Sequence, residues 1–323
     1  MARDLGAAMA TEARLGLRAT SGRRGPQEGS NRAGPASGDL LAKRAVAELA
    51  WGKPMLVAAV QLNSQEDLVA NLSRVRHWAA QAAAAGAQAV AFPENFAFMG
   101  EEAQRRELAE RLDGTFRGPI FSALAESAAK HGLWVFGGGM PERSDDPARP
   151  YNTQVVIDPR GALAATYRKV HLFDVTTPDG TSYRESAATS AGSEAVSVEV
   201  CGVRIGLSIC YDVRFPELYR RLVDQGARVA VVPAAFTVPT GKDHWHALLR
   251  ARAIENQIYV VAPAQHGKHP RGRQTYGKTL VVDPWGEVIA QCSEGEGLVT
   301  ANLDFGYQDR VRTALPALVH RKW

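Results

Sequence analysis

The 323-residue sequence has little of what marks a membrane protein, a disulfide-rich protein or a zinc protein. It contains only 3 cysteines, Cys201, Cys210 and Cys292, without the close paired spacing of a disulfide framework or a zinc site. This scarcity fits a reducing compartment, and we expect a cytoplasmic protein. No apolar run approaches about 18 residues, so the sequence predicts neither a transmembrane helix nor a membrane partner.

The chain also lacks a strong charge of one sign outside its first 50 residues. The formal net charge is +4, but residues 1–50 hold 8 Lys and Arg against 5 Asp and Glu, which leaves 30 against 29 in residues 51–323. A nearly neutral globular part has no basic surface that would attract a phosphate backbone, so we expect no nucleic-acid partner.

Large apolar residues are scarce in the first 50 residues, which are rich in Ala, Gly, Arg and Ser. Such a composition cannot bury a core, and we predict a disordered N-terminal extension over residues 1–52. The extension has no continuous apolar stretch, which excludes a secretory signal, and its five acidic residues argue against an organelle transit peptide.

Four features recur in the same order in two halves of the chain. Each half has an apolar segment, a second one with proline near its end, a third one, and a fourth that ends in Asp-Pro-x-Gly. In order, the pairs are 55–62 and 204–210, 87–93 and 228–233, 133–138 and 258–262, and 155–161 and 281–286. Asp, Pro and Gly at these spacings suit a type I turn, so we predict hairpins that return over 162–167 and 287–291.

Two similar halves with strands this apolar predict an α/β fold, a four-layer α-β-β-α sandwich of two pseudo-symmetric halves. Two doubly wound domains are the alternative, but no Pro/Gly/Ser-rich linker separates the halves. The pattern predicts helices over 68–85, over 215–225, and from a cap at Asp243 to Gln257. The longest irregular segment, 175–192, is a candidate active-site loop.

Cys210 ends an apolar strand and opens a charged turn. A thiol at a strand's carboxyl end is exposed to substrate and lies beside backbone N–H groups that can stabilise an oxyanion, so we interpret Cys210 as a candidate nucleophile. A buried structural thiol is the alternative. A cysteine–histidine pair is the competing reactive arrangement, with His171, His244 or His246 as the base.

Glu94 and Lys169 also follow apolar strands. Burial at that point is expected to raise the pKa of Glu94 toward values useful for a general base, and an inward lysine can stabilise an oxyanion. Each has an ordinary alternative, a surface carboxylate or an edge-strand lysine.

Two further motifs point to other chemistries only weakly. His244 and His246 lie two apart on a predicted helix, where their side chains point to different faces, so we predict no metal site. The three glycines at 137–139 follow a strand, but no Gly-x-Gly-x-x-Gly or Gly-Lys-Ser/Thr pattern supports a phosphate loop.

Taken together, three motifs resemble those of the nitrilase superfamily of carbon–nitrogen hydrolases, in its Nit branch. They are Phe92-Pro-Glu-Asn95, Tyr167-Arg-Lys-Val-His-Leu-Phe173 and Ile209-Cys-Tyr-Asp-Val-Arg-Phe-Pro-Glu217. The resemblance covers about residues 55–320. It implies a carbon–nitrogen hydrolase domain over 53–323 with the α-β-β-α fold, no cofactor, and a homodimer.

The resemblance also implies roles for individual residues. Glu94, Lys169 and Cys210 match the family's catalytic triad, and Glu185 matches a second glutamate that orients the lysine and the substrate. The backbone N–H of Tyr211 would share the oxyanion with Lys169. Arg214, close to the nucleophile, is our candidate for binding a substrate carboxylate, with a structural ion pair as the alternative.

The expected function is hydrolysis of a small linear carboxamide, similar to deaminated glutathione, to an acid and ammonia through a thioester on the cysteine. The alternatives are an omega-amidase that acts on monoamides similar to 2-oxoglutaramate, a scaffold without activity, and a metal-dependent amidohydrolase that uses His244 and His246. The expected partner is a small-molecule amide.

Overall fold

Two six-stranded sheets carry the fold. The structure is a computed structural model that describes residues 54–114, 118–177 and 180–322. The predicted disordered extension, residues 1–52, lies outside the described residues. All described residues belong to one compact unit rather than to two separate domains.

The first sheet has the strand order β16-β1-β2-β3-β4-β5. Its strands are β1 (Met55–Gln61), β2 (Ala89–Ala91), β3 (Trp134–Glu142), β4 (Tyr151–Ile157), β5 (Leu163–Arg168) and β16 (Gly297–Leu303). β1, β2 and β3 run parallel, whereas β4, β5 and β16 pair antiparallel with their neighbours.

The second sheet repeats this plan with the order β15-β14-β11-β10-β9-β8. Its strands are β8 (Ser197–Val200), β9 (Val203–Leu207), β10 (Val229–Val231), β11 (Tyr259–Ala262), β14 (Leu280–Val282) and β15 (Val288–Gln291). β9, β10 and β11 run parallel, and the outer strands pair antiparallel. The predicted duplication is therefore confirmed strand by strand, and β5 and β15 are the two predicted hairpin partners.

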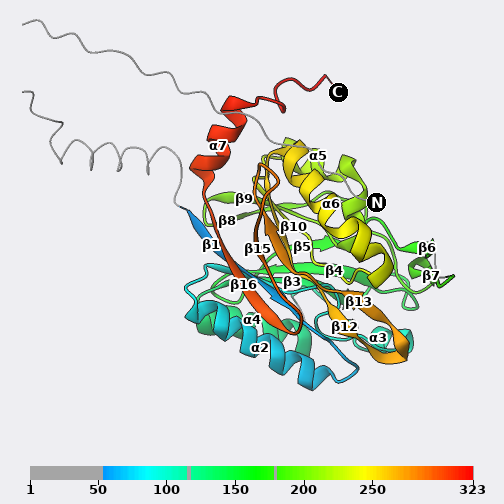
Figure 1. Ribbon diagram of the computed structural model, residues 1–323. Coiled ribbons are helices and arrows are strands. Elements are labelled where there is room, and N and C mark those ends of the chain that lie inside the picture. The colour runs from blue at the N-terminus through cyan, green and yellow to red at the C-terminus, as the bar shows by residue number, and fades with distance from the viewer. Residues whose placement is uncertain (1–53, 115–117, 178–179, 323) are drawn as a thin grey trace, which may run out of the picture. The chain divides into compact units, whose positions relative to one another are not determined.

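Helices cover the outer faces of both sheets, as Figure 1 shows, with α2 and α4 on one side of the strands and α5 and α6 on the other. The described helices are α2 (Leu68–Ala84), α3 (Glu102–Glu107), α4 (Pro119–His131), α5 (Pro216–Asp224), α6 (Val238–Asn256) and α7 (Phe305–Ala314). The predicted four-layer α-β-β-α sandwich is confirmed. No helix in the described ranges is long and apolar enough to span a bilayer.

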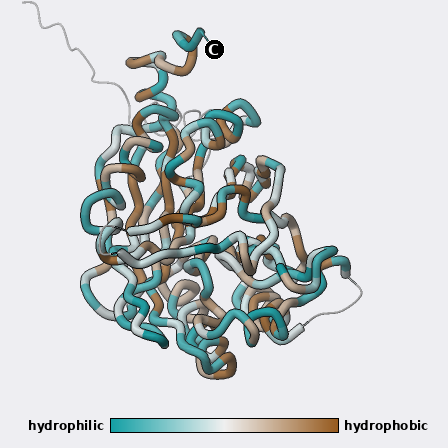
Figure 2. Tube along the Cα trace, turned by 90° about the vertical axis from the view of Figure 1, so that its right-hand side faces the viewer, coloured by the Kyte–Doolittle hydropathy of each residue, from teal (hydrophilic) through white to brown (hydrophobic). Residues whose placement is uncertain are grey.

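Alternate residues of a single strand show why both of its faces are apolar. Val57 and Ala59 of β1 pack in the cluster that joins the two sheets, whereas Ala58 and Val60 pack in the cluster beneath α2 and α4. Figure 2 shows hydrophobic residues concentrated along the strands and hydrophilic residues at the periphery. The strands are thus buried on both faces, which is what their continuous apolar runs require.

Two predicted boundaries are wrong. Helix α6 begins at Val238, not at Asp243, because Pro239 in the first turn supplies a helical φ angle and lacks the N–H that would be unpaired there. The strand predicted to end at Cys210 ends at Leu207, and Cys210 opens a 3-10 turn, η2 (Cys210–Arg214).

The predicted irregular segment 175–192 contains regular structure in its described part. It holds most of a small hairpin, β6 (Asp174–Thr176) with β7 (Ser182–Arg184), and the short turn η1 (Glu185–Ala187). A second small hairpin, β12 (His266–Lys268) with β13 (Gln274–Tyr276), includes the turn η3 (Pro270–Gly272). Both hairpins contribute residues to the cavity described below.

Candidate active site

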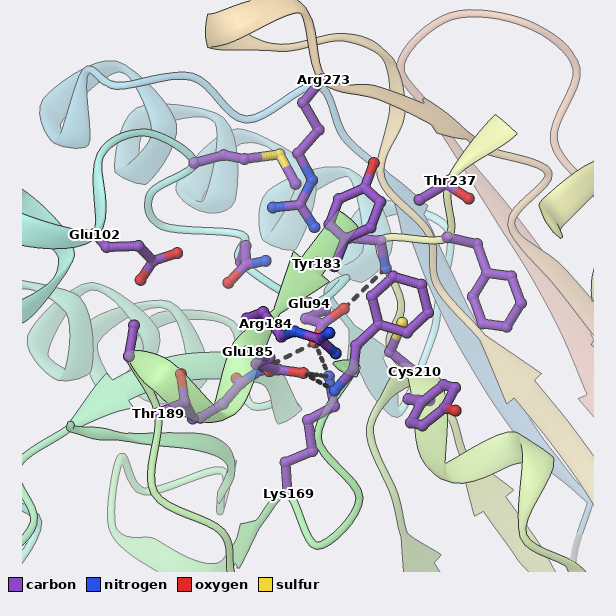
Figure 3. Close-up of a pocket in the computed structure, with 18 of the residues that line it drawn as sticks. Glu94, Glu102, Lys169, Tyr183, Arg184, Glu185, Thr189, Cys210, Thr237 and Arg273 are labelled. Atoms are coloured by element: carbon purple, nitrogen blue, oxygen red, sulfur yellow. Dashed lines mark hydrogen bonds and ion pairs between the residues drawn. The ribbon is translucent and has the colours of Figure 1, made fainter. Parts of the chain in front are cut away.

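The segments that follow β2, β5 and β9 line one cavity of about 290 Å³. Glu94, Lys169 and Cys210, one from each of these connections, line it together with Glu185 and Tyr211. Figure 3 shows the side chains of Glu94, Lys169 and Cys210 converging on the same part of the cavity. Three residues from separate connections, the outer two of them 116 positions apart in the chain, therefore meet at one cavity.

Cys210 is held in an uncommon backbone conformation. Its φ angle is 50°, in the left-handed region that a residue with a side chain seldom adopts. Its N–H donates to the carbonyl of Pro233 at 2.8 Å, which ties the turn to the end of β10. The strain turns the thiol toward the cavity, although Cys210 as a whole is only 8% exposed.

Lys169 is nearly inaccessible and surrounded by carboxylates. Its Nζ donates to Glu94 Oε1 at 3.0 Å and to Glu185 Oε2 at 2.8 Å. Burial alone would lower the pKa of Lys169, but the charges of Glu185 and Glu94 outweigh it and raise this pKa above its usual value. Lys169 is therefore a fixed cation at neutral pH.

Glu94 is 4% exposed and fully hydrogen-bonded. Its Oε1 accepts from Lys169 and from Asn152 Nδ2 at 2.9 Å, and its Oε2 accepts from the N–H of Ala235 at 3.0 Å. Burial would raise the pKa of Glu94, but the charge and hydrogen bond of Lys169, together with a hydrogen bond from the Cys210 thiol, lower it. The expectation of a raised pKa is wrong, because the nearby cation outweighs the loss of solvent.

The thiol of Cys210 has the opposite tendency. Burial and the negative charge of Glu94 raise its pKa well above the usual value, despite the opposing charge of Lys169. At neutral pH the proton therefore resides on sulfur and the negative charge on Glu94. This arrangement pairs a protonated nucleophile with a base already in contact with it.

Asn152 is a site residue that the sequence did not reveal. Its Nδ2 bridges the two glutamates, at 2.9 Å from Glu94 Oε1 and 3.4 Å from Glu185 Oε1. Neighbouring Gly139 has a φ angle of 79°, and a Cβ there would lie 2.7 Å from Asn152 Oδ1 and 3.1 Å from Glu94 Cγ. Gly139 thus leaves room for these two side chains, which accounts for part of the glycine run that resembled a weak phosphate-loop signal.

Asp212 joins the turn that carries Cys210 to the strand end that carries Lys169. Its buried carboxylate accepts from the Ile209 N–H at 2.8 Å, the Tyr167 hydroxyl at 2.7 Å and the His171 N–H at 3.1 Å. His171 Nδ1 also lies 2.7 Å from Asp212 Oδ1. The imidazole is thus engaged with Asp212 and stacks on Phe215, so the structure does not pair His171 with the thiol.

Arg214 also lines the cavity, close to aromatic side chains. Its guanidinium carbon lies 5.7 Å from the centre of the Tyr211 ring and 5.4 Å from that of Phe236, and its Nη1 lies 3.3 Å from His244 Nδ1. The described residues form no ion pair with Arg214. Thr237 and Thr240 line the same wall, and their hydroxyls lie 2.8 Å apart.

His244 and His246 face different neighbours, as expected for positions two apart on a helix. His246 Nε2 lies 2.7 Å from Gln291 Oε1, whereas His244 lies beside Arg214. Neither lines the cavity that holds Cys210. Within the described ranges, no group of three or more His, Cys, Asp or Glu side chains has the arrangement of a metal site.

Comparison with known proteins adds an independent line of observation. The carbon–nitrogen hydrolase family matches residues 56–313. A deaminated glutathione amidase of Synechocystis sp. is 44% identical over 273 residues, covering 83% of this chain and 98% of that protein. The deaminated glutathione amidase of Homo sapiens is 42% identical over 272 residues, covering 83% of this chain and 82% of that protein.

Solved structures agree with this assignment. The crystal structure of Saccharomyces cerevisiae Nit3, a member of branch 10 of the nitrilase superfamily, superposes with a TM-score of 0.77 at 32% identity, covering 84% of this chain and 98% of that one. The family match extends over most of the chain and includes the residues around the cavity. The chain belongs to the carbon–nitrogen hydrolase family.

Proposed function

We propose that this amidase hydrolyses a small amide that carries carboxylates, deaminated glutathione in the first instance, through a thioester on Cys210. The observation that carries the proposal is the contact of Glu94 with both Lys169 and the Cys210 thiol in one buried cavity. Two relatives at 42% and 44% identity bear the name of that activity.

Acylation uses the proton arrangement described above. Glu94 takes the proton from the Cys210 sulfur as the sulfur attacks the amide carbon, forming the C–S bond. The oxyanion is held by Lys169 and by the backbone N–H of Tyr211, which lies at the start of a 3-10 turn where N–H groups have no partner within the turn. Glu94 then protonates the nitrogen, the C–N bond breaks and the amine leaves.

Deacylation reverses these roles. Glu94 takes a proton from water, the hydroxide attacks the thioester carbon, and the same donors hold the second oxyanion. The C–S bond breaks, the acid leaves and the sulfur regains its proton. A primary carboxamide would release ammonia, whereas both amide bonds of a glutathione skeleton are secondary and would release an amine.

Two neighbouring residues support the triad. Glu185 binds Lys169 through both of its carboxylate oxygens and accepts the N–H of Phe173 at 2.7 Å, so it fixes the lysine in place. Arg214 has no carboxylate partner among the described residues and lines the cavity, which supports a role in binding a substrate carboxylate.

We also propose a homodimer that works in the cytoplasm. All three cysteines are free, and a nucleophilic thiol must stay reduced. Ile254 and Trp285 are large apolar side chains that remain 47% and 54% exposed, and a second subunit would cover them. Light scattering on the purified chain tests the dimer, and a monomeric mass at micromolar concentration contradicts it.

A substrate comparison with intact-mass detection tests the main proposal. Purified protein is incubated with deaminated glutathione and with 2-oxoglutaramate, and each is scored for product and for an acyl adduct on Cys210. We expect faster turnover of deaminated glutathione and an adduct that Cys210→Ala abolishes. A preference for 2-oxoglutaramate would instead assign the omega-amidase activity, and an unreacted thiol with both would overturn the proposal.

A further inference from the structure

Arg273 lines the same cavity but has no part in the triad. Its Nε is buried and has no hydrogen-bond partner among the described residues. No carboxylate of the described residues forms an ion pair with its guanidinium. Two other cavity arginines differ: Arg105 donates to Thr189 at 3.2 Å and lies 3.7 Å from Glu102, and Arg184 is exposed to water. A buried guanidinium N–H without a partner is costly unless a ligand supplies the acceptor.

The hairpin that carries Arg273 is held firmly. Beside it, the ring of His269 contacts the carbonyl of Ser64 at 2.8 Å through Nδ1 and the hydroxyl of Thr275 at 2.7 Å through Nε2. Burial, with the nearby charge of Arg273, lowers the pKa of His269 to about 4, so the ring stays neutral and keeps both contacts at physiological pH. Arg273 is therefore preorganised rather than waiting for a loop to close.

Its place in the cavity identifies the part of the substrate that it faces. In Figure 3, Arg273 enters from one side and Lys169 from the other, with Glu94 between them. The positive charge of Arg273 is among the influences that lower the pKa of Glu94, so it acts on the carboxylate that delivers a proton to the departing nitrogen. Arg214, by contrast, belongs to the turn of the nucleophile and lies beside Tyr211 and Phe236.

We propose that Arg273 binds a carboxylate on the amine half of the substrate and so selects secondary amides of amino acids or peptides over simple carboxamides. The inference rests on the proposed function and adds a division of labour to it, with Arg214 facing the acyl half and Arg273 the leaving group. The amine half of deaminated glutathione ends in such a carboxylate. Because that half leaves with the amine, Arg273 assists acylation and takes no part in deacylation.

The test uses two substrates that differ in one group: deaminated glutathione, and its analogue in which ethylamine replaces the terminal glycine and removes the carboxylate. Wild-type enzyme, Arg273→Gln, Arg273→Lys and a control, Arg271→Gln, are compared by steady-state kinetics and by the separate rates of thioester formation and breakdown. Arg271 lies on the same turn and its side chain is 64% exposed. Its one ion-pair partner among the described residues is Glu101, at the surface, where such a pair contributes little stability.

We expect Arg273→Gln to lose about 10- to 100-fold in kcat/KM on deaminated glutathione, in the acylation step alone, and to leave the analogue unchanged. Arg273→Lys should recover part of the loss, and Arg271→Gln should match wild type. An equal loss on both substrates would show that Arg273 acts through Glu94 and would overturn the inference, as would no loss at all. If wild-type enzyme acylates with neither substrate, the proposed function fails and this inference fails with it.

Discussion

In the first half of the molecule, β2 is followed by two residues and then by Glu94, whereas in the second half β10 is followed by two residues and then by Ala234. The strand register makes these positions equivalent, because Ala89 and Val229 begin the two strands and pair with Val57 and Ile205. Five residues after Val57 and Ile205 stand Leu62 and Cys210, which are therefore equivalent positions of the two halves. The positions equivalent to the nucleophile and to the base thus hold apolar residues, Leu62 and Ala234.

Lys169, the third member of the triad, also has no like residue at the equivalent position of the second half. Thr166 of β5 and Gln291 of β15 hold equivalent places in their hairpins, and three residues further on stand buried Lys169 and exposed Glu294. The first half therefore supplies base and lysine, and the second half supplies the sulfur. The two halves therefore repeat the same arrangement of strands, but there is one set of catalytic residues, and both halves contribute to it.

The largest effect should come from Cys210→Ala, which removes the only member of the triad in the second half. We expect kcat to fall on the order of 10⁴-fold or more, because no thioester can form. The free energy of unfolding should change little, since the substitution removes only the small buried thiol group. Steady-state assays with thermal unfolding as the control check this, and turnover above a hundredth of wild type would contradict it.

Glu94→Gln should have the next largest effect, because loss of the base should reduce turnover roughly 10²- to 10⁴-fold. The same change removes the negative charge that raises the pKa of Cys210, so the thiolate should form at lower pH than in the wild type. Alkylation of Cys210 by iodoacetamide, followed across pH by intact mass, measures the shift. A profile displaced to higher pH would contradict the charge arrangement.

Asp212→Asn should have an intermediate effect, since it loosens the link between the two halves without touching substrate. The Asp212 carboxylate accepts hydrogen bonds from two N–H groups and one hydroxyl, and loss of its charge should lower the free energy of unfolding by about 1–3 kcal/mol. Misplacement of the turn should lower kcat by roughly 10- to 100-fold. Asp158→Asn, at the turn between β4 and β5, is the matched control, because this carboxylate also accepts backbone N–H groups but does not line the cavity, and it should leave kcat unchanged.

Moving the sulfur to the equivalent position in the first half should regain the least, because no activity should return to a protein that lacks Cys210. In the double variant Cys210→Ala and Leu62→Cys, no acyl adduct should form at residue 62, because its neighbours by symmetry are Ala234 and Glu294 rather than a glutamate and a lysine. Intact-mass analysis after substrate incubation checks this. An adduct there would mean that the frame alone confers reactivity.

Much of this arrangement could be predicted from the sequence because it rests on local pattern. The repeated apolar strands and the two Asp-Pro-x-Gly turns predicted both sheets and their hairpins, and motif resemblance brought Glu94, Lys169 and Cys210 forward. The start of α6 was misjudged because an interior aspartate resembled a cap, although Pro239 was the stronger start signal.

What escaped prediction depends on contacts between remote segments. Asn152 and Arg273 have ordinary sequence surroundings, and only the folded chain places them at the cavity. The direction of the pKa shift of Glu94 likewise depends on the approach of Lys169, 75 residues away. A sequence indicates that a carboxylate is buried but not which cation is buried with it.

Among the described residues, the last strand, β16, completes the first sheet by pairing along the whole of the first strand, β1. During synthesis on the ribosome, this edge of β1 stays uncovered until β16 has been made. An exposed strand edge invites pairing with other chains. Newly made chains are therefore vulnerable to aggregation until β16 emerges, and a premature stop codon before β16 would leave that vulnerability permanent.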